Sequence, residues 1–337
     1  MEPVPPVRTL SLLRWASVAT AAVIGLWPAP PALADPARPG NTVSVVDALS
    51  PPSSAVQVDV VGGDAFLRLR VVPGAEVRVP GYQGEPYLWI RGDGTVWRNA
   101  ESPAAVLNED RYALREVPDA TVQVGDAQPE PRWQSYGSGG TVLWHDHRAH
   151  WMGSGDPPTI DPDGLVQRWE VPIEIDGVEV VIQGSLLRRS PASSAWWGVV
   201  VVVGALTAVT ARRSLRWTSS TALGAGVLVA GVGWWSWAGL PSPARPAPVV
   251  GVLALLAALA AVIPWVGRRK VPVGPMLAGA GTALVMAGWF GRQGITAAVI
   301  PGLDTAWPWR LAMTSALGAG VVVASVGVWR SLHPPAR

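Results

Sequence analysis

Apolar and polar positions divide the chain into two halves with different patterns. Between residues 43 and 189, short segments alternate apolar and polar residues, as at 55–61 and 65–72. Alternation with a period of two is typical of half-buried β-strands. Beyond residue 194, long apolar stretches replace the alternation. The chain is therefore predicted to have a mixed fold, an all-β sandwich followed by a bundle of transmembrane helices.

Turn residues separate the predicted strands. The Asp176-Gly177 pair lies between alternating runs at residues 167–175 and 178–187, which predicts a hairpin with a type I′ turn. The pattern predicts about eight or nine short strands in roughly 150 residues, a density typical of sandwiches. Residues 35–190 are therefore expected to form an extracytoplasmic sandwich of the immunoglobulin or cupredoxin type.

Five apolar stretches in the second half are long enough, or nearly so, to cross about 30 Å of hydrocarbon. None carries a charged residue or a histidine at its centre, which argues against a pump or a proton-coupled transporter. A short cytoplasmic tail is expected at residues 331–337. The five predicted transmembrane helices lie within residues 195–330, at about 195–211, 220–240, 249–266, 275–290 and 309–329.

Charge is distributed unevenly between the two halves. Residues 35–194 hold 22 acidic and 13 basic side chains, a net charge of −9, whereas residues 195–337 hold 11 basic side chains and one acidic side chain, Asp304. The basic residues cluster after the first, third and fifth stretches. By the positive-inside rule, the β domain is predicted to lie outside the plasma membrane and the C-terminus in the cytoplasm. An odd number of spans leads to the same orientation.

The first 34 residues have the features of a signal peptide. Arg8 and Arg14 supply the charged region, residues 16–26 the apolar region, and Ala32-Leu33-Ala34 the small residues before a cleavage site. Cleavage is predicted before Asp35. An uncleaved membrane anchor is the alternative interpretation.

Composition excludes several classes of site. The chain has no cysteine, so it has no disulfide framework, zinc–thiolate cluster or thiol nucleophile. Lys270 is the only lysine among 26 basic residues, and with 37 Gly and 33 Pro this indicates codon usage in a GC-rich genome. The arginine excess is therefore not interpreted as nucleic-acid binding. No P-loop, nucleophile elbow or dinucleotide fingerprint is present, so an enzyme is the least supported class.

Three of the four histidines lie within six residues, in the segment from Trp144 to Met152. If the segment continues a strand, His145 and His147 project from one face, about 7 Å apart. His150 can join them if the chain turns at Arg148-Ala149. The sequence therefore predicts that the three imidazoles converge.

Convergent imidazoles suit copper, zinc or nickel, and a thioether such as that of Met152 favours copper(I). Asp146 points to the opposite strand face, so it is a ligand only after a bend, or otherwise an acceptor that orients His150. The metal site is thus predicted at His145, His147, His150, Met152 and Asp146. Two other interpretations stay open: a polar network that ties a loop to the sandwich, and a pH sensor.

Several segments of the first half resemble a family of envelope membrane proteins from GC-rich bacteria. The resemblance implies a secreted β domain followed by several spans, and it supplies no activity. It covers about 75 residues, and the histidine-rich segment is its most specific part. The residues that carry it are 81–88, 93–97, Ser102-Pro103, Leu107-Asn108, Arg111-Tyr112 and 144–152.

Two further resemblances concern copper. Trp144-His145-Asp146-His147, followed by Met152, is similar to the W-H-x-H segment in the cupredoxin domain of the particulate methane monooxygenase B subunit. The order of signal, sandwich and helices resembles copper-resistance proteins of the CopC–CopD type. Those proteins commonly begin their mature chain with a histidine, whereas this chain is predicted to begin with Asp35-Pro36.

Together these features favour a membrane-anchored extracytoplasmic protein that binds copper, with zinc as the alternative ion, in metal handling at the cell envelope. The expected partner is the lipid bilayer, and no nucleic acid is expected. The alternative function is a non-catalytic scaffold that docks other envelope membrane proteins.

Overall fold

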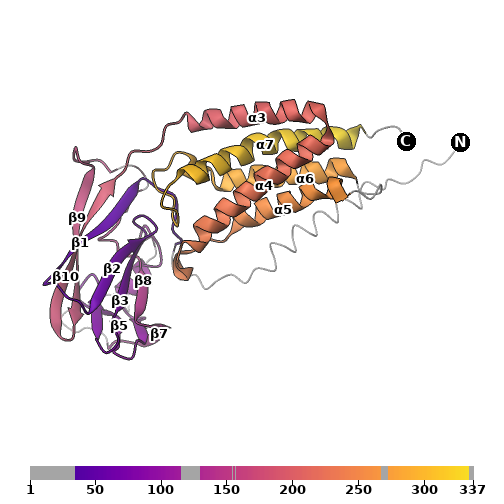
Figure 1. Ribbon diagram of the computed structural model, residues 1–337. Coiled ribbons are helices and arrows are strands. Elements are labelled where there is room, and N and C mark those ends of the chain that lie inside the picture. Colours follow the sequence, from indigo (N-terminus) through magenta and orange to yellow (C-terminus); the bar gives the residue numbers. More distant parts are fainter. Residues whose placement is uncertain (1–34, 115–129, 154, 156, 267–271, 334–337) are drawn as a thin grey trace. The chain divides into compact units, whose positions relative to one another are not determined.

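The computed structural model describes residues 35–114, 130–153, 155, 157–266 and 272–333. The predicted signal peptide lies outside these ranges. Within them, a strand region from Thr42 to Arg188 precedes a region of long helices from Trp196 to Leu332 (Figure 1). A mostly antiparallel β region followed by helices is the order that the apolar pattern predicted.

The strand region contains two sheets in which all strand pairs are antiparallel. The three-stranded sheet has the order β2 (Val56–Val61), β3 (Phe66–Val71), β8 (Thr141–Trp144). The seven-stranded sheet has the order β1 (Thr42–Ser50), β10 (Val178–Arg188), β9 (Leu165–Ile175), β4 (Val77–Pro80), β5 (Pro86–Ile90), β6 (Val96–Asn99), β7 (Trp133–Gly137).

The predicted hairpin at Asp176-Gly177 is confirmed. β9 pairs with β10 from Val178–Ile175 to Leu187–Leu165, with one irregularity near the far end. Asp176 and Gly177 have φ angles of 50° and 82°, and a type I′ turn requires positive φ at both central residues. Aspartate and glycine tolerate that conformation, so the turn fixes the register of the two strands.

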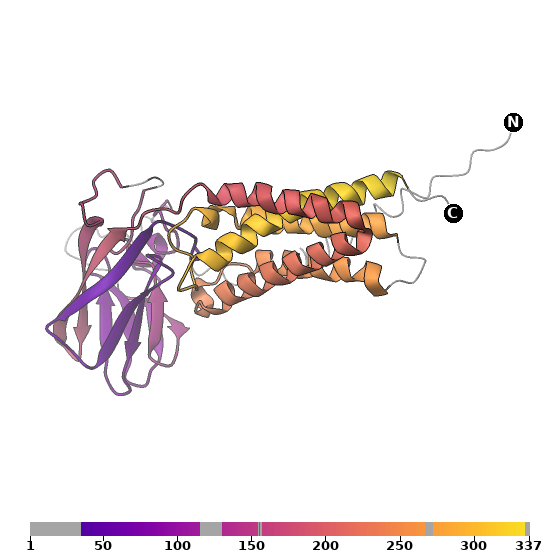
Figure 2. The same ribbon diagram turned by 45° about the horizontal axis from the view of Figure 1, so that its top comes forward.

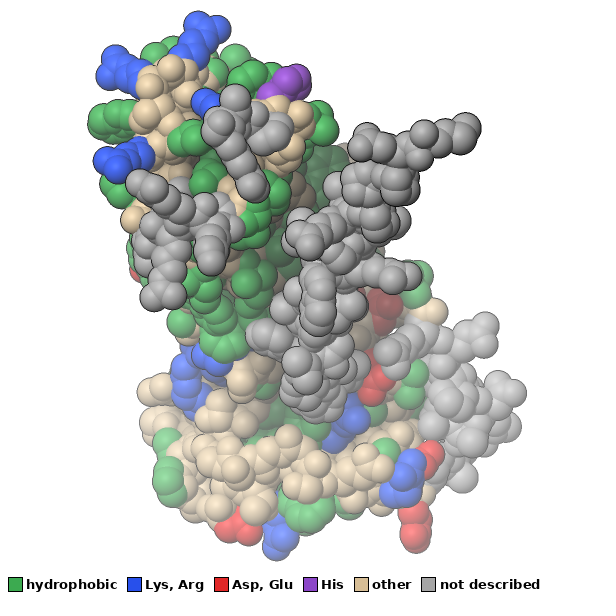
Figure 3. Space-filling view, turned by 90° about the vertical axis from the view of Figure 1, so that its right-hand side faces the viewer, with side chains coloured by type: hydrophobic (Ala, Val, Ile, Leu, Met, Phe, Trp, Pro, Cys, Tyr) green, Lys and Arg blue, Asp and Glu red, His purple; other side chains and the backbone are tan. Residues whose placement is uncertain are grey.

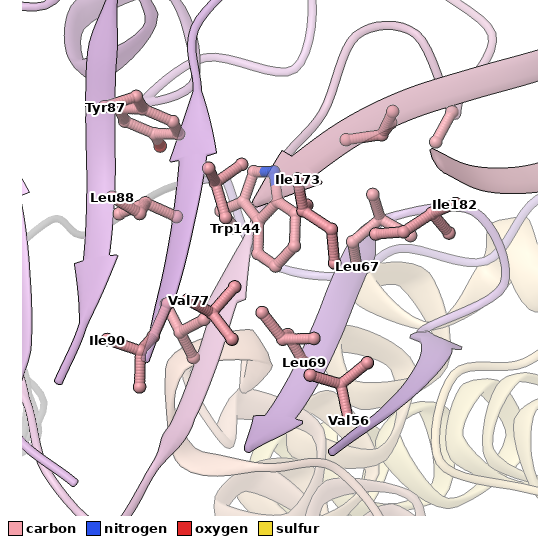
Figure 4. Close-up of a cluster of buried hydrophobic side chains, with 14 of the residues drawn as sticks. Val56, Leu67, Leu69, Val77, Tyr87, Leu88, Ile90, Trp144, Ile173 and Ile182 are labelled. Carbon is pink, nitrogen blue, oxygen red and sulfur yellow. The ribbon is translucent and has the colours of Figure 1, made fainter. Parts of the chain in front are cut away.

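One hydrophobic core is built from both sheets. Leu67 and Leu69 of the smaller sheet, and Leu88 and Ile173 of the larger, are all at most 1% exposed and belong to one cluster. Figure 4 shows the Trp144 indole among these side chains. The Trp144 side chain therefore fixes the end of β8, from which the histidine segment continues.

Five long helices follow the strands and pack along one another (Figures 1 and 2). α7 contacts α6, α3 and α4, and α5 contacts α4 and α6. The helices are α3 (Trp196–Arg213), α4 (Leu215–Ala238), α5 (Val249–Val266), α6 (Val273–Phe290) and α7 (Trp307–Leu332); a short α2 (Pro103–Leu107) lies within the strand region, and 3-10 turns occupy Ser242–Ala244 and Arg292–Ile295.

The predicted count of five spans is corrected to three among the described residues. α4, α6 and α7 are long and apolar enough to cross a membrane. α3 ends on two charged residues, Arg212 and Arg213, which lower its mean hydropathy. The apolar run of α5 with described side chains, Val249–Ile263, is shorter than a full span. Three such helices are consistent with a membrane protein.

Small residues allow the helices to approach closely. A Cβ added to Gly281 of α6 would lie 2.2 Å from the backbone nitrogen of Ala324 in α7. A Cβ on Gly320 would lie 2.9 Å from the carbonyl oxygen of Gly281. Gly320 and Ala324 therefore contribute to the contact between α6 and α7, where backbone packs on backbone.

Arginine and tryptophan pair at the helix ends. The Arg216 guanidinium lies 5.9 Å from the ring centroid of Trp265, and that of Arg330 lies 5.2 Å from the Trp329 centroid. Figure 3 faces one end of the helices and shows several basic side chains in blue over it. Such pairs suit the headgroup level of a bilayer, because the ring is amphipathic and the cation is hydrated.

Candidate functional site

The histidine segment leaves β8 and turns at once. Trp144 ends the strand, so His145 and His147 follow it in a turn instead of sharing a strand face, which corrects the prediction. The Ala149 amide donates to the Asp146 carbonyl at 2.9 Å and closes the turn. The turn arises here because the Asp146 side chain accepts locally from Arg148, an interaction that competes with continued strand pairing.

The Asp146 side chain stabilises this turn by hydrogen bonds. Its carboxylate accepts from the Trp144 indole at 3.0 Å and from two nitrogens of the Arg148 guanidinium, each at 2.8 Å. Asp146 is 2% exposed, so these charge-assisted bonds compensate for its burial. The carboxylate does not bond His150, so its predicted role as the acceptor that orients that ring is wrong.

The turn brings the three imidazoles together. The ring centroid of His150 lies 5.2 Å from that of His147 and 6.0 Å from that of His145, with edge-on geometry in both cases. The three rings therefore lie together, and the turn that brings His150 to the other two is centred on His147-Arg148, one residue before the predicted position. Met152 is half-buried, and no ring contact or hydrogen bond joins it to the histidines in the part of the chain that the structure describes.

Both nitrogens of His145 face backbone carbonyls. Nδ1 contacts the carbonyl oxygen of Ala65, and Nε2 lies 2.9 Å from that of Asp35. The ring stacks on Phe66 with centroids 4.1 Å apart. A neutral imidazole carries one N–H, so it donates to only one of the two oxygens. The other ring nitrogen keeps its lone pair but faces a carbonyl oxygen, which blocks the approach of a ligand to it.

His147 is held by one ring nitrogen. Its Nε2 lies 3.0 Å from the Asp110 carbonyl oxygen and donates to it, which leaves Nδ1 with the lone pair. The Tyr82 hydroxyl accepts from the His147 amide at 3.0 Å and donates to the Asn108 side chain. The Tyr82 ring also stacks near His147, at 5.8 Å between centroids, so this side chain orients the imidazole.

His150 has an unpaired nitrogen. Its Nδ1 lies 3.1 Å from the Trp151 carbonyl oxygen and donates to it. Its Nε2 is buried and has no hydrogen-bond partner among the described residues. The residue is 1% exposed, so this lone pair is withheld from bulk water. A buried acceptor without a partner is costly, and a bound group that coordinates it removes that cost.

An ion pair that the sequence did not reveal lies beside the histidines. Arg111 donates to both carboxylate oxygens of Asp64, at 2.7 and 2.8 Å, and the carboxylate also accepts from the Thr42 hydroxyl at 2.7 Å. Asp64 and Arg111 are 47 residues apart, and no motif links them. Together with Trp151 they line part of a cavity of about 500 Å³.

Burial keeps the three imidazoles neutral. Desolvation lowers the pKa of His145 and of His147, although the bonds to backbone carbonyls oppose this. Desolvation, reinforced by the charge of Arg111, lowers the pKa of His150 to about 4. The rings are therefore deprotonated at pH 7, and a neutral imidazole is the form that binds a metal ion.

The donor set fits a metal ion only in part. Within the described residues, no group of three or more His, Asp or Glu side chains is arranged to hold an ion. His145 and Asp146 are occupied by other partners, which leaves His147 Nδ1 and His150 Nε2 as the two available lone pairs. Two imidazole nitrogens fit an ion of low coordination number, such as copper(I), better than tetrahedral zinc, which takes four ligands.

Comparisons with known proteins add no assignment. No protein-family model, no curated protein and no solved structure matches the chain. The resemblances and the sandwich type expected from the sequence stay predictions.

Proposed function

We propose that this protein is a membrane-attached copper-binding protein of the cell envelope, with His147 and His150 as the ligands. The observation that supports this proposal most is the buried Nε2 of His150, which has no partner among the described residues and lies in a cluster of neutral imidazoles. The similarity of the Trp144–Met152 segment to copper-handling domains favours the same ion. His145 and Tyr82 position the cluster without binding the ion.

The membrane helices hold the copper site at the envelope. In this proposal the strand region lies outside the plasma membrane and the C-terminus inside, because basic residues concentrate after predicted cytoplasmic helix ends. The acidic side chains of residues 35–194 raise the local cation concentration within a Debye length of about 8 Å. Copper is bound for storage or delivery and undergoes no reaction here.

The test is competition for copper(I) between the full chain in detergent and a chromogenic chelator, under reducing conditions. We expect the wild type to withdraw copper and His150→Gln to bind it at least about tenfold more weakly, because one of two ligands is lost. His150→Gln keeps a polar side chain of similar size, so circular dichroism should show an unchanged fold.

The fourth histidine provides the matched control. His333 is exposed and stacks on Trp329 at the end of α7, so His333→Gln should bind copper as the wild type does. Equal copper uptake by the wild type and His150→Gln would contradict the proposal. Tighter binding of zinc than of copper(I) would overturn the choice of ion.

A further inference from the structure

A groove crosses the outer face of the seven-stranded sheet, apart from the histidine cluster. Its volume is about 860 Å³, and its lining includes residues of β4, β5, β7, β9 and β10. The groove opens where β4 and β9 separate, because their pairing ends after Val77–Ile175 and Arg78–Glu174. Pro80 and Pro172 follow on the two strands, and proline has no amide to continue the ladder.

One wall of the groove is aromatic. The Trp89 and Trp133 rings lie 5.5 Å apart between centroids, tilted by 56°. The guanidinium groups of Arg78 and Arg91 lie 5.4 and 5.2 Å from the Trp89 centroid and brace that ring. Four prolines complete the apolar lining: Pro80, Pro86, Pro131 and Pro172.

The other wall is acidic. Glu174 and Glu179 are exposed, line the groove and lie directly opposite each other on β9 and β10. Like charges in this arrangement repel and destabilise the sheet. Neither carboxylate forms an ion pair with another residue that the structure describes, since Arg78, the nearest basic residue in register, is bonded to Glu76. A cationic partner would relieve this repulsion.

We propose that the groove binds a proline-rich, arginine-containing peptide segment of another protein, in the polyproline II conformation. Such a segment has no internal backbone hydrogen bonds and is recognised by aromatic-lined grooves. Pro80 and Pro172 cannot donate to an added β-strand, so the groove does not suit strand addition. The tryptophans pack on the prolines of the ligand, and the paired carboxylates bind its arginine.

The test measures binding of synthetic peptides to the full chain in detergent, by fluorescence anisotropy of a label on the peptide. The probe is a peptide of repeated Pro-Pro-Arg, and the matched peptide control repeats Pro-Pro-Glu. We expect the arginine peptide to bind and the glutamate peptide to bind at least about tenfold more weakly. A high salt concentration should weaken binding of the arginine peptide, because salt screens the exposed carboxylates of Glu174 and Glu179.

Variants of the two walls sharpen the test. Trp133→Ala should lower the affinity for the arginine peptide about tenfold. The double variant Glu174→Gln, Glu179→Gln should bind the arginine and glutamate peptides with equal affinity. Trp97→Ala is the matched control, because Trp97 lies opposite Trp89 on the same sheet without lining the groove. It should leave the affinity unchanged.

Three outcomes would overturn the proposal: no binding of the arginine peptide by the wild type, equal affinities of wild type and Trp133→Ala, or binding of a neutral oligosaccharide such as cellohexaose in place of the peptide. The copper site is not involved, so His150→Gln should bind the peptide as the wild type does. Failure of one proposal is therefore distinguishable from failure of the other.

Discussion

The strand region and the helices satisfy their buried polar groups in different ways. In the strand region the Ser102 hydroxyl donates to Glu85, 17 residues away, and the Asn99 amide donates to the Pro86 carbonyl. In the helices the buried hydroxyls of Thr207 and Thr314 donate to carbonyls four residues earlier in the same helix, although that of Ser236 donates to the Pro301 carbonyl, 65 residues away. Side-chain hydrogen bonds thus link separate segments of the strand region, in addition to its hydrophobic core, whereas the two threonine hydroxyls bond within their own helix.

This difference shows where specific chemistry arises. A hydroxyl that bonds its own helix is satisfied before the helices pack, so it leaves nothing for a ligand. In the strand region, groups from distant segments must meet, and His150 Nε2 is left without a partner among the described residues; in the helices the buried Ser219 hydroxyl of α4 is also without one. The predictions below test the contrast, from the largest expected effect to the smallest.

The largest effect is expected at Glu85, which is 4% exposed. Its carboxylate accepts from Ser102 Oγ at 2.7 Å and from the backbone amides of Gln83 and Ala104 at 2.9 and 3.4 Å. Glu85→Ala leaves these donors unpaired and should lower the free energy of unfolding by about 4 kcal/mol. Denaturant titration followed by tryptophan fluorescence measures this. The exposed Glu174→Ala should change stability by less than about 0.5 kcal/mol; similar losses in both variants would contradict the role of Glu85.

The next effect is expected where α6 and α7 meet. Gly281→Ala places a methyl group 2.2 Å from the Ala324 backbone nitrogen, which cannot rotate away, and should cost about 3 kcal/mol. Titration with dodecyl sulfate, followed by the loss of helical circular dichroism, measures this change in the free energy of unfolding. Gly279→Ala on the same helix meets nothing within 4 Å and should be neutral or slightly stabilising. A tolerated Gly281→Ala would show that the helices do not depend on this contact.

Acidification should weaken the strand region. The pKa of His150 is lowered to about 4 in the folded protein, below its ordinary value of 6.5, so the unfolded chain binds more protons between these values. Stability is therefore lost as the pH falls, by about 2 kcal/mol between pH 6.5 and 5. Thermal unfolding measured at several pH values between 6.5 and 5 tests this predicted loss of stability. His150→Gln should flatten the pH dependence, and His333→Gln should not; an unchanged slope in His150→Gln would refute this assignment.

The smallest effect is expected from a hydroxyl inside the helices. Thr207 is 2% exposed, and its hydroxyl donates to the Val203 carbonyl of the same helix at 2.8 Å. Thr207→Val keeps the shape of the side chain and should cost less than about 1 kcal/mol, because the backbone bonds of the helix are retained. The dodecyl sulfate titration measures the change in the free energy of unfolding. A decrease as large as that caused by Gly281→Ala would contradict the contrast between the two regions.

The sequence predicted strands where alternation was regular and turn residues were distinct. It did not reveal β1, β4 or β7, for physical reasons that differ. β1 contains a register shift between Val46 and Ala48, which interrupts its alternation. β4 has four residues and ends at Pro80, and β7 is mostly exposed, so neither has enough apolar positions to be recognised. The helix count differs because Arg212 and Arg213 lower the mean hydropathy of α3 and because the apolar run of α5, counted over fully described residues, ends at Ile263.

At the histidine cluster, the sequence predicted the convergence but not the partners. The imidazoles converge because of a local turn, which a short segment can encode. Their hydrogen-bond partners are carbonyls of Asp35, Ala65 and Asp110, and any residue type supplies a carbonyl. Side-chain identity therefore carries no signal for these contacts, and only the fold shows that His145 is occupied.

The sheet order of the strand region also constrains how the protein is made. β1, the first strand in the chain, pairs with β10, the last, and the Ser185–Asp47 hydrogen bond joins residues 138 positions apart. During synthesis β1 has no partner until β10 has emerged, and α3 follows only a few residues later. Such non-local pairing is slow, and an unpaired strand is exposed to aggregation while it waits. The seven-stranded sheet is therefore expected to close late, as the first long helix is being synthesised.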